Sequence, residues 1–130
     1  MPTPSGRPPF SHPPHAFGRR AEDAAAAHLE AAGWGIVARN VRWRRKEIDI
    51  VARRGGVVAF VEVKARAGQG FGGPLAAITW RKRREIALVA RWWIAEHGRP
   101  GERYRFDAVA VHARPDSGLL VEHHPGAWRL

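Results

Sequence analysis

Residues 47–64 read EIDIVARRGGVVAFVEVK, two strongly apolar segments on either side of a pair of glycines. Their alternation with a period of two predicts two β-strands joined by a turn at the glycines. In the first strand, Ile48 and Ile50 are expected on one face and Asp49 on the other. The second strand places Glu62 among valines in the same way. Acids inside such apolar strands need a chemical reason.

The length of the turn decides how the two acids face each other. If the glycines form a two-residue turn, Arg54 pairs with Val57 and Asp49 lies directly opposite Glu62. A four-residue loop pairs Asp49 with Phe60 and leaves Glu62 diagonal, and either length keeps both acids on one face. Because opposed like charges destabilise a sheet, a positive group is expected between them. A divalent cation meets that need.

Lys64 follows Glu62 by two residues, so it adds a fixed positive charge on the same face. Taken singly, each of these residues is typical of the solvated face of an antiparallel sheet. The combination is more specific, because Glu62 lies thirteen positions after Asp49 and Lys64 completes a Glu-x-Lys pattern. It matches the Asp…Glu-x-Lys core of the PD-(D/E)XK nucleases.

The charge balance indicates a polyanionic partner. The chain has 22 Lys and Arg against 12 Asp and Glu, a formal net charge of +10. Nucleic acid and an anionic membrane surface are the two candidates. The sequence has no long apolar run and no charged leader before an apolar segment, which favours nucleic acid and a cytoplasmic protein. With no cysteine, disulfides and thiolate-zinc sites are excluded, and oxygen ligands are the expected metal chemistry.

The organisation along the chain predicts one domain, residues 18–130, after a disordered proline-rich tail of residues 1–17. Helices are expected from about Arg19 to Ala32 and from Thr79, as N-cap, to Gly98. Strands are expected at residues 35–41, 47–52, 57–64, 104–112 and 119–123. This order indicates a mixed α/β domain with a mixed central sheet flanked by helices.

Each helix places one charged residue in line with its apolar face. Glu22 shares a stripe with Ala25, Ala26, Leu29 and Ala32, so it either caps the start of the helix or contributes to an internal site. Spacing alone favours the first interpretation.

The second helix has an apolar stripe that packs on the sheet: Ile86, Val89, Ala90 and Trp93. Lys82 extends this stripe at its N-terminal end, from which it is expected to reach toward the edge of the sheet that carries the acids.

From Gly18 to about Trp128 the chain resembles the YraN family of small, poorly characterised bacterial proteins. The motifs that carry the resemblance are Gly18-x-x-Ala21-Glu22, Arg39-Asn40, Glu47-Ile48-Asp49, Phe60-Val61-Glu62-Val63-Lys64-x-Arg66, Lys82 and Arg105-Phe106-Asp107. That family is assigned to the PD-(D/E)XK endonuclease-like fold, similar to archaeal Holliday junction resolvases. The resemblance therefore implies a restriction-endonuclease-like core. One departure is Lys46, where the family usually has glycine.

The resemblance implies that Glu22, Asp49, Glu62 and Lys64 occupy the positions of the catalytic acids and lysine. Asp49 and Glu62 would hold Mg²⁺ or Mn²⁺, and Glu22 would bind a second ion or orient water. Lys64 would position the nucleophile or neutralise the charge that develops on phosphate.

Two basic residues are expected to bind phosphate, Arg66 on the Lys64 face and Lys82 on the second helix. The sequence thus predicts a metal-dependent endonuclease that hydrolyses phosphodiester bonds in DNA, with branched recombination or repair intermediates among the substrates. The alternative is a non-catalytic nucleic-acid-binding protein with the same fold. The likeness to resolvases also implies a homodimer. Arg105 and Asp107, two apart on one strand, are consistent with a structural ion pair.

Overall fold

The structure is a computed structural model that describes residues 14–67 and 78–129. Its elements, in chain order, are α1 (Pro14–Ala31), β1 (Gly35–Trp43), β2 (Lys46–Arg54), β3 (Val57–Ala67), α3 (Trp80–His97), β4 (Arg103–Ala113) and β5 (Leu119–Trp128). Every helix and strand predicted from the sequence is present. The expected proline-rich tail lies, for residues 1–13, outside the described residues.

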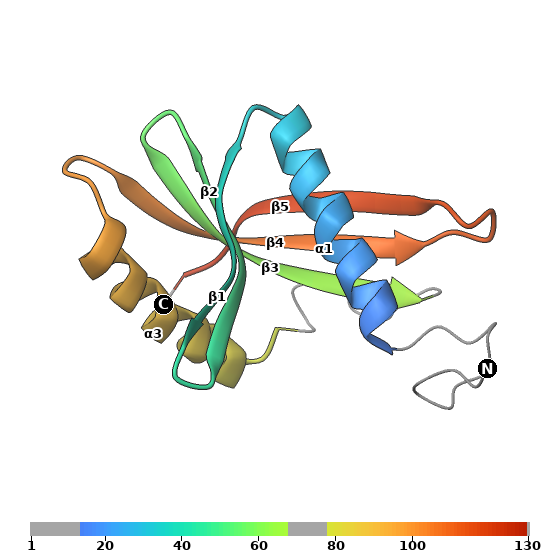
Figure 1. Ribbon diagram of the computed structural model, residues 1–130, viewed down its shortest axis with the longest axis horizontal. Helices are drawn as coiled ribbons and strands as arrows, with labels where there is room; N and C mark the ends of the chain where they lie inside the picture. Colours follow the sequence, from blue (N-terminus) through green and yellow to red (C-terminus); the bar gives the residue numbers. More distant parts are fainter. Residues whose placement is uncertain (1–13, 68–77, 130) are drawn as a thin grey trace, which may run out of the picture.

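The strands form one mixed sheet in the order β1-β2-β3-β4-β5. Among the described strands β3 and β4 are parallel, with α3 in the connection between them, and the other neighbours are antiparallel. Figure 1 shows a strongly twisted sheet, in which β1 and β2 run across the direction of β3, β4 and β5 while α1 crosses in front. This mixed sheet with flanking helices is the predicted restriction-endonuclease-like core.

Helix α1 begins earlier than predicted, at Pro14 instead of about Arg19. Proline is tolerated in the first turn because its missing N–H would have no partner there. The helix ends at Ala31, and Gly33 follows in the left-handed region with φ 93°. Ala32, predicted to face inward, is therefore exposed. The buried residues of α1 are Ala21, Ala25, Ala26 and Leu29.

Helix α3 packs on the sheet, as predicted, and the structure places it on the face opposite to α1. Its buried residues are Ile86, Val89, Ala90 and Trp93. Thr79 caps the helix, because its hydroxyl accepts a hydrogen bond of 3.1 Å from the backbone N–H of Lys82. Phe60 of β3 meets Trp93 edge-on, with ring centres 5.7 Å apart. Each large side chain buried in this way contributes about 2 kcal/mol. Neither of the two described helices is long and apolar enough to cross a membrane.

The turn between β2 and β3 has two residues, the first of the two lengths that the sequence allowed. Both glycines have positive φ, 54° and 80°, and Arg54 pairs with Val57. The paired residues continue to Ile50 and Val61. Asp49 and Glu62 are next in this register, so the turn brings the two acids together at the end of the ladder.

The prediction that Ile48 and Ile50 share a face is wrong. Ile50 packs in the core under α1, whereas Ile48 packs in the core under α3. The cause is an interruption of strand pairing at Asp49: the β1 register has no partner for it, and the β3 ladder begins only at the following residue. Asn40, which faces this gap from β1, has a φ of 51°. The alternation of side chains along β2 is therefore broken at Asp49, and Ile48 and Ile50 lie on opposite faces of the sheet.

Candidate metal centre

Asp49 is an acid that faces a second acid, Glu62. Its Oδ2 accepts a hydrogen bond of 2.7 Å from the backbone N–H of Val63, and its side chain is hydrogen-bonded to Glu62. Burial raises the pKa of Asp49 to about 8, and the negative charge of Glu62 and that hydrogen bond add to the effect. The Val63 N–H and the charge of Lys82 oppose it. Without a cation, the Asp49–Glu62 pair thus holds a proton at neutral pH.

Glu62 is buried, with 4% of its side chain exposed, and lies between two lysines. Lys64 Nζ is 3.3 Å from its Oε2, and Lys82 Nζ is 3.9 Å from the same oxygen. The sequence predicted the first contact from strand alternation and the second from the start of α3. Two different elements thus supply the positive charge expected between the opposed acids.

Glu22 joins this region from α1. It lies in the third turn of the helix, which removes the interpretation of a residue that caps the start. Its Oε1 accepts a hydrogen bond of 2.9 Å from Asn40 Nδ2. Burial raises the pKa of Glu22, and the charges of Asp49 and Glu47 raise it further, against the hydrogen bond from Asn40 and the charge of Arg39.

Three carboxylates converge closely enough to hold a metal ion. Glu22, Glu47 and Asp49 each offer one oxygen, and these oxygens lie within 4.8 Å of one another. The metal ligands predicted from the sequence were Glu22, Asp49 and Glu62, and Glu47 was not among them. The signal for Glu47 was its position two residues before Asp49, which strand alternation places on the same face.

Asn40 was also not selected from the sequence, although it connects two of these acids. Its Nδ2 donates to Glu22 Oε1 at 2.9 Å and to Glu47 Oε1 at 3.4 Å. The second oxygen of Glu47 accepts a hydrogen bond of 2.8 Å from Arg42 Nε. Asparagine is among the residues that tolerate a left-handed conformation, which is the one that Asn40 adopts in β1.

Arg66 lies near the end of β3 and is half-buried. It forms no hydrogen bond or ion pair with any residue in 14–67 or 78–129. Its contact with phosphate therefore stays a prediction.

A second buried acid lies elsewhere in the sheet, on β4. Asp107 accepts two hydrogen bonds from Arg105, at 2.7 and 2.9 Å, and one of 3.0 Å from the N–H of Gly126. His123 Nε2 lies 2.7 Å from its Oδ2. Burial alone would raise the pKa of Asp107, but the hydrogen bonds from His123, Arg105 and Gly126 outweigh it and the pKa is lowered. Arg105 and Asp107 thus form the structural ion pair that their spacing suggested.

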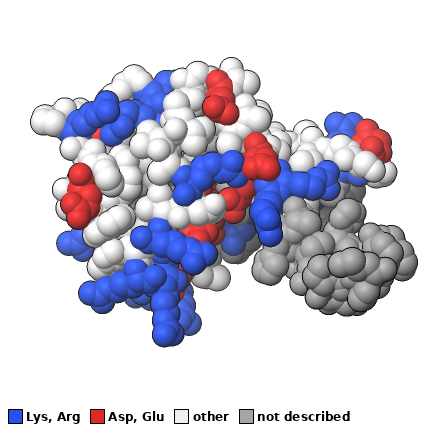
Figure 2. Space-filling view, viewed as in Figure 1, with Lys and Arg blue, Asp and Glu red and all other residues white. Residues whose placement is uncertain are grey.

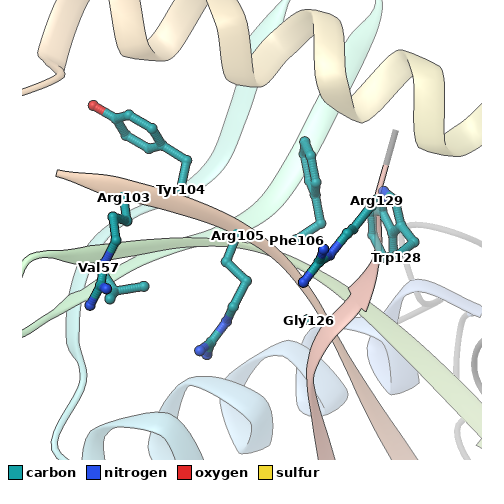
Figure 3. Close-up of a pocket in the computed structure, with 8 residues that line it drawn as sticks. All are labelled: Val57, Arg103, Tyr104, Arg105, Phe106, Gly126, Trp128 and Arg129. Carbon is teal, nitrogen blue, oxygen red and sulfur yellow. The ribbon is translucent and has the colours of Figure 1, made fainter.

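A cavity of about 460 Å³ borders this ion pair at Arg105 (Figure 3). Its lining comes from the starts of β3 and β4 and the end of β5: Val57, Arg103, Tyr104, Arg105, Phe106, Gly126, Trp128 and Arg129. Figure 3 shows Tyr104 and Phe106 pointing toward α3, with Arg105 pointing the other way, toward α1. The lining contains no carboxylate.

The chain is similar in sequence to proteins of one known family. A model of the uncharacterised protein family UPF0102 matches residues 21–111. A UPF0102 protein of Parafrankia sp. (strain EAN1pec) is 45% identical over 112 residues, which cover 86% of this chain and 95% of the relative. One from Symbiobacterium thermophilum is 46% identical, covering 78% and 86%. Another from Desulforapulum autotrophicum is 50% identical, covering 74% and 79%. These names state no activity.

Proposed function

Because the chain belongs to the uncharacterised family UPF0102, which is the YraN family that its motifs resemble, we propose a function from its own site. That function is metal-dependent hydrolysis of phosphodiester bonds in nucleic acid, with DNA as the first candidate. The observation that carries it is the group of three carboxylate oxygens within 4.8 Å, beside a buried glutamate that contacts two lysines. The proposed compartment is the cytoplasm.

The donor set fits Mg²⁺ or Mn²⁺. Glu22, Glu47 and Asp49 offer oxygen ligands, which hard divalent cations prefer. The raised pKa of Asp49 supports the same assignment, because a cation would take the place of the proton that Asp49 shares with Glu62. When bound, such an ion supplies an acidified water and stabilises negative charge on phosphate.

The chain's own residues would divide the remaining work. Glu62, once Asp49 has lost its proton, would accept a hydrogen bond from water, or bind the ion as the motif implies. Lys64, with its ammonium 3.3 Å from Glu62, would position the nucleophile or neutralise charge on the phosphate. Lys82 and Arg66 would bind phosphate oxygens on either side. Glu22 would complete the metal site or orient water.

One observation favours a second candidate, a nucleic-acid-binding protein that does not cleave. Glu62 contacts two lysines while Asp49 shares a proton with it, and this arrangement balances its own charge without an ion. Such a protein would bind nucleic acid through the same basic surface. It would lose no affinity when Asp49 is replaced.

The test is cleavage of a labelled panel of linear, flapped and four-way DNA, with matching RNA, in Mg²⁺, Mn²⁺ or EDTA. We expect metal-dependent cleavage by the wild type, reduced at least about 100-fold in Asp49→Asn and Glu62→Gln. The matched control is Glu30→Gln, which changes an exposed glutamate two turns beyond Glu22 on α1. No cleavage by any variant, with equal binding by all, would leave the non-catalytic candidate. Sedimentation velocity of the same preparations tests the predicted homodimer.

A further inference from the structure

The turn between β1 and β2 breaks the usual preferences of its conformation. Trp43 pairs with Lys46, so Arg44 and Arg45 form a two-residue turn. Arg44 has a φ of 60°, in the left-handed region that glycine adopts without steric cost. Two-residue hairpin turns with positive φ at the first position normally carry glycine there.

The chain uses glycine for the same task one strand later. The β2–β3 turn also has two residues, and both are glycines with positive φ. The contrast shows that β1–β2 carries a local strain that β2–β3 avoids. Strain of this kind is concentrated at functional sites, where the side chain contributes more than the backbone loses.

The β1–β2 turn is also a concentration of positive charge. Arg42, Arg44, Arg45 and Lys46 fall within five positions, and with Glu47 they line a cavity of about 330 Å³. The guanidinium of Arg44 lies over the Trp43 ring, 4.5 Å from its centre, which holds the group in place while its N–H edges stay exposed.

Two of these cations have no partner in the described part of the chain. Arg45 is exposed and Lys46 is half-buried, and neither forms a hydrogen bond or ion pair with the described residues. Figure 2 shows Lys and Arg side chains gathered at the bottom of the view, over the β1–β2 turn and the start of α3, with acidic side chains above them.

The position of the turn relative to the acid cluster matches a nucleic-acid strand. Lys46 directly precedes Glu47, and the two-residue turn of Arg44 and Arg45 comes directly before Lys46. Every nucleotide of a nucleic-acid strand carries one phosphate, so a strand offers phosphates in close succession. A strand with one phosphate at the acid cluster would therefore bring a neighbouring phosphate to the turn.

We propose that the β1–β2 turn is a phosphate clamp that holds the nucleic-acid backbone beside the phosphate at the acid cluster. This proposal rests on the proposed function only where it places a phosphate at the acid cluster. Nucleic acid fits better than an anionic membrane because the acid cluster directly beside the clamp would repel a continuous anionic surface. Arg44 also covers the Trp43 ring, which an apolar membrane anchor would expose.

Arg44→Gly tests the clamp, because glycine fits the left-handed conformation while the cation is lost. We expect the affinity for labelled duplex DNA, measured by fluorescence anisotropy in EDTA, to fall about fivefold. The slope of log affinity against log salt concentration should become smaller in magnitude by about 1. The thermal midpoint should stay unchanged or rise. The double variant Arg44→Gly/Arg45→Gly, which copies the β2–β3 turn, should bind more weakly still. The control is Arg91→Gln, which removes one exposed charge from the later part of α3.

Unchanged DNA affinity and salt slope in Arg44→Gly would overturn the clamp. So would unchanged DNA affinity together with weakened binding to phosphatidylglycerol vesicles, which would assign the turn to a membrane. If Arg44→Gly binds and cleaves DNA as the wild type does, the clamp is rejected and the proposed nuclease stands. Weakened binding in a chain that cuts nothing supports the clamp while rejecting the nuclease.

Discussion

Asp49 and Asp107 are the same kind of residue in the same sheet, with opposite electrostatics. Asp107 is fully buried and receives hydrogen bonds from Arg105 and Gly126, with His123 at hydrogen-bond distance, so its pKa is lowered. Asp49 faces another acid, and its pKa is raised to about 8. The first arrangement is complete without any ligand. The second sets two acids against each other, and under the proposed function a cation would complete it.

The largest expected effect is the loss of folding stability when Asp107 is replaced. Asp107→Ala leaves Arg105 and His123 without their partner, and removing one member of a buried ion pair costs about 3 to 5 kcal/mol. Urea denaturation at pH 7 measures this loss. A change below about 1 kcal/mol would contradict the view of Asp107 as a structural centre.

A second prediction concerns the choice between Glu47 and Glu62 as a metal ligand. Glu47→Gln should weaken Mn²⁺ binding about 10- to 100-fold, because Glu47 is part of the convergent group. Glu62→Gln should weaken it less, because Glu62 lies outside that group and contacts two lysines. Isothermal titration calorimetry with Mn²⁺ measures both, with Glu30→Gln as control. The reverse order would restore the ligand set that the sequence indicated.

The two acids should change stability in opposite directions as pH rises, and in different pH ranges. The folded pKa of Asp49 lies above its ordinary value of 3.8, so between about pH 4 and 8 the folded state binds more protons than the unfolded state. Metal-free stability therefore falls as pH rises through this range, by about 1 kcal/mol for each pH unit. Asp107, with a lowered pKa, contributes stability above pH 3.8 that is lost as pH falls through its folded pKa.

Asp49→Asn provides the check on this pH dependence. The amide imitates the protonated acid, since it can accept from the Val63 N–H and donate to Glu62. In urea unfolding with EDTA, the free energy of unfolding of this variant should depend less on pH between pH 5 and 9. The loss of stability below pH 4 should be the same as in the wild type. An equal slope in wild type and variant would mean that another group binds the proton.

The smallest expected effect sharpens the role of Lys82. Its ammonium is 3.9 Å from Glu62 and lowers the pKa of Asp49. Lys82→Gln should shift the midpoint of the stability profile to higher pH by about half a unit. Lys82→Arg, which keeps the charge, is the matched control and should leave the midpoint in place. A shift to lower pH would exclude the contact as a source of positive charge.

The fold was largely predictable because its signals are local. Alternating apolar residues, the two glycines of the β2–β3 turn and the Thr79 cap each act within a few residues of the chain. The same locality explains why the register that joins Asp49 to Glu62 could be derived from the length of one turn.

The remaining features of the site depend on contacts between distant segments. Asn40 meets Glu22 across 18 positions of the sequence, through a kink in β1 that no propensity indicates. Ile48 leaves its expected face because the pairing of β2 with its neighbours is interrupted at Asp49. His123 reaches Asp107 through a register shift between β4 and β5. Such irregularities arise from tertiary packing and leave no periodic trace.

The irregular edges of the sheet also protect the protein from aggregation. A regular edge strand offers free N–H and C=O groups on which other chains can grow. At one edge, β1 has a register shift between Ile36 and Ala38 and a kink at Asn40. At the other, β5 contains Pro125, which lacks an N–H, followed by Gly126 with a φ of 59°. Neither edge presents a long flat template, so the kink that brings Asn40 to the acids also hinders strand-by-strand growth into fibres.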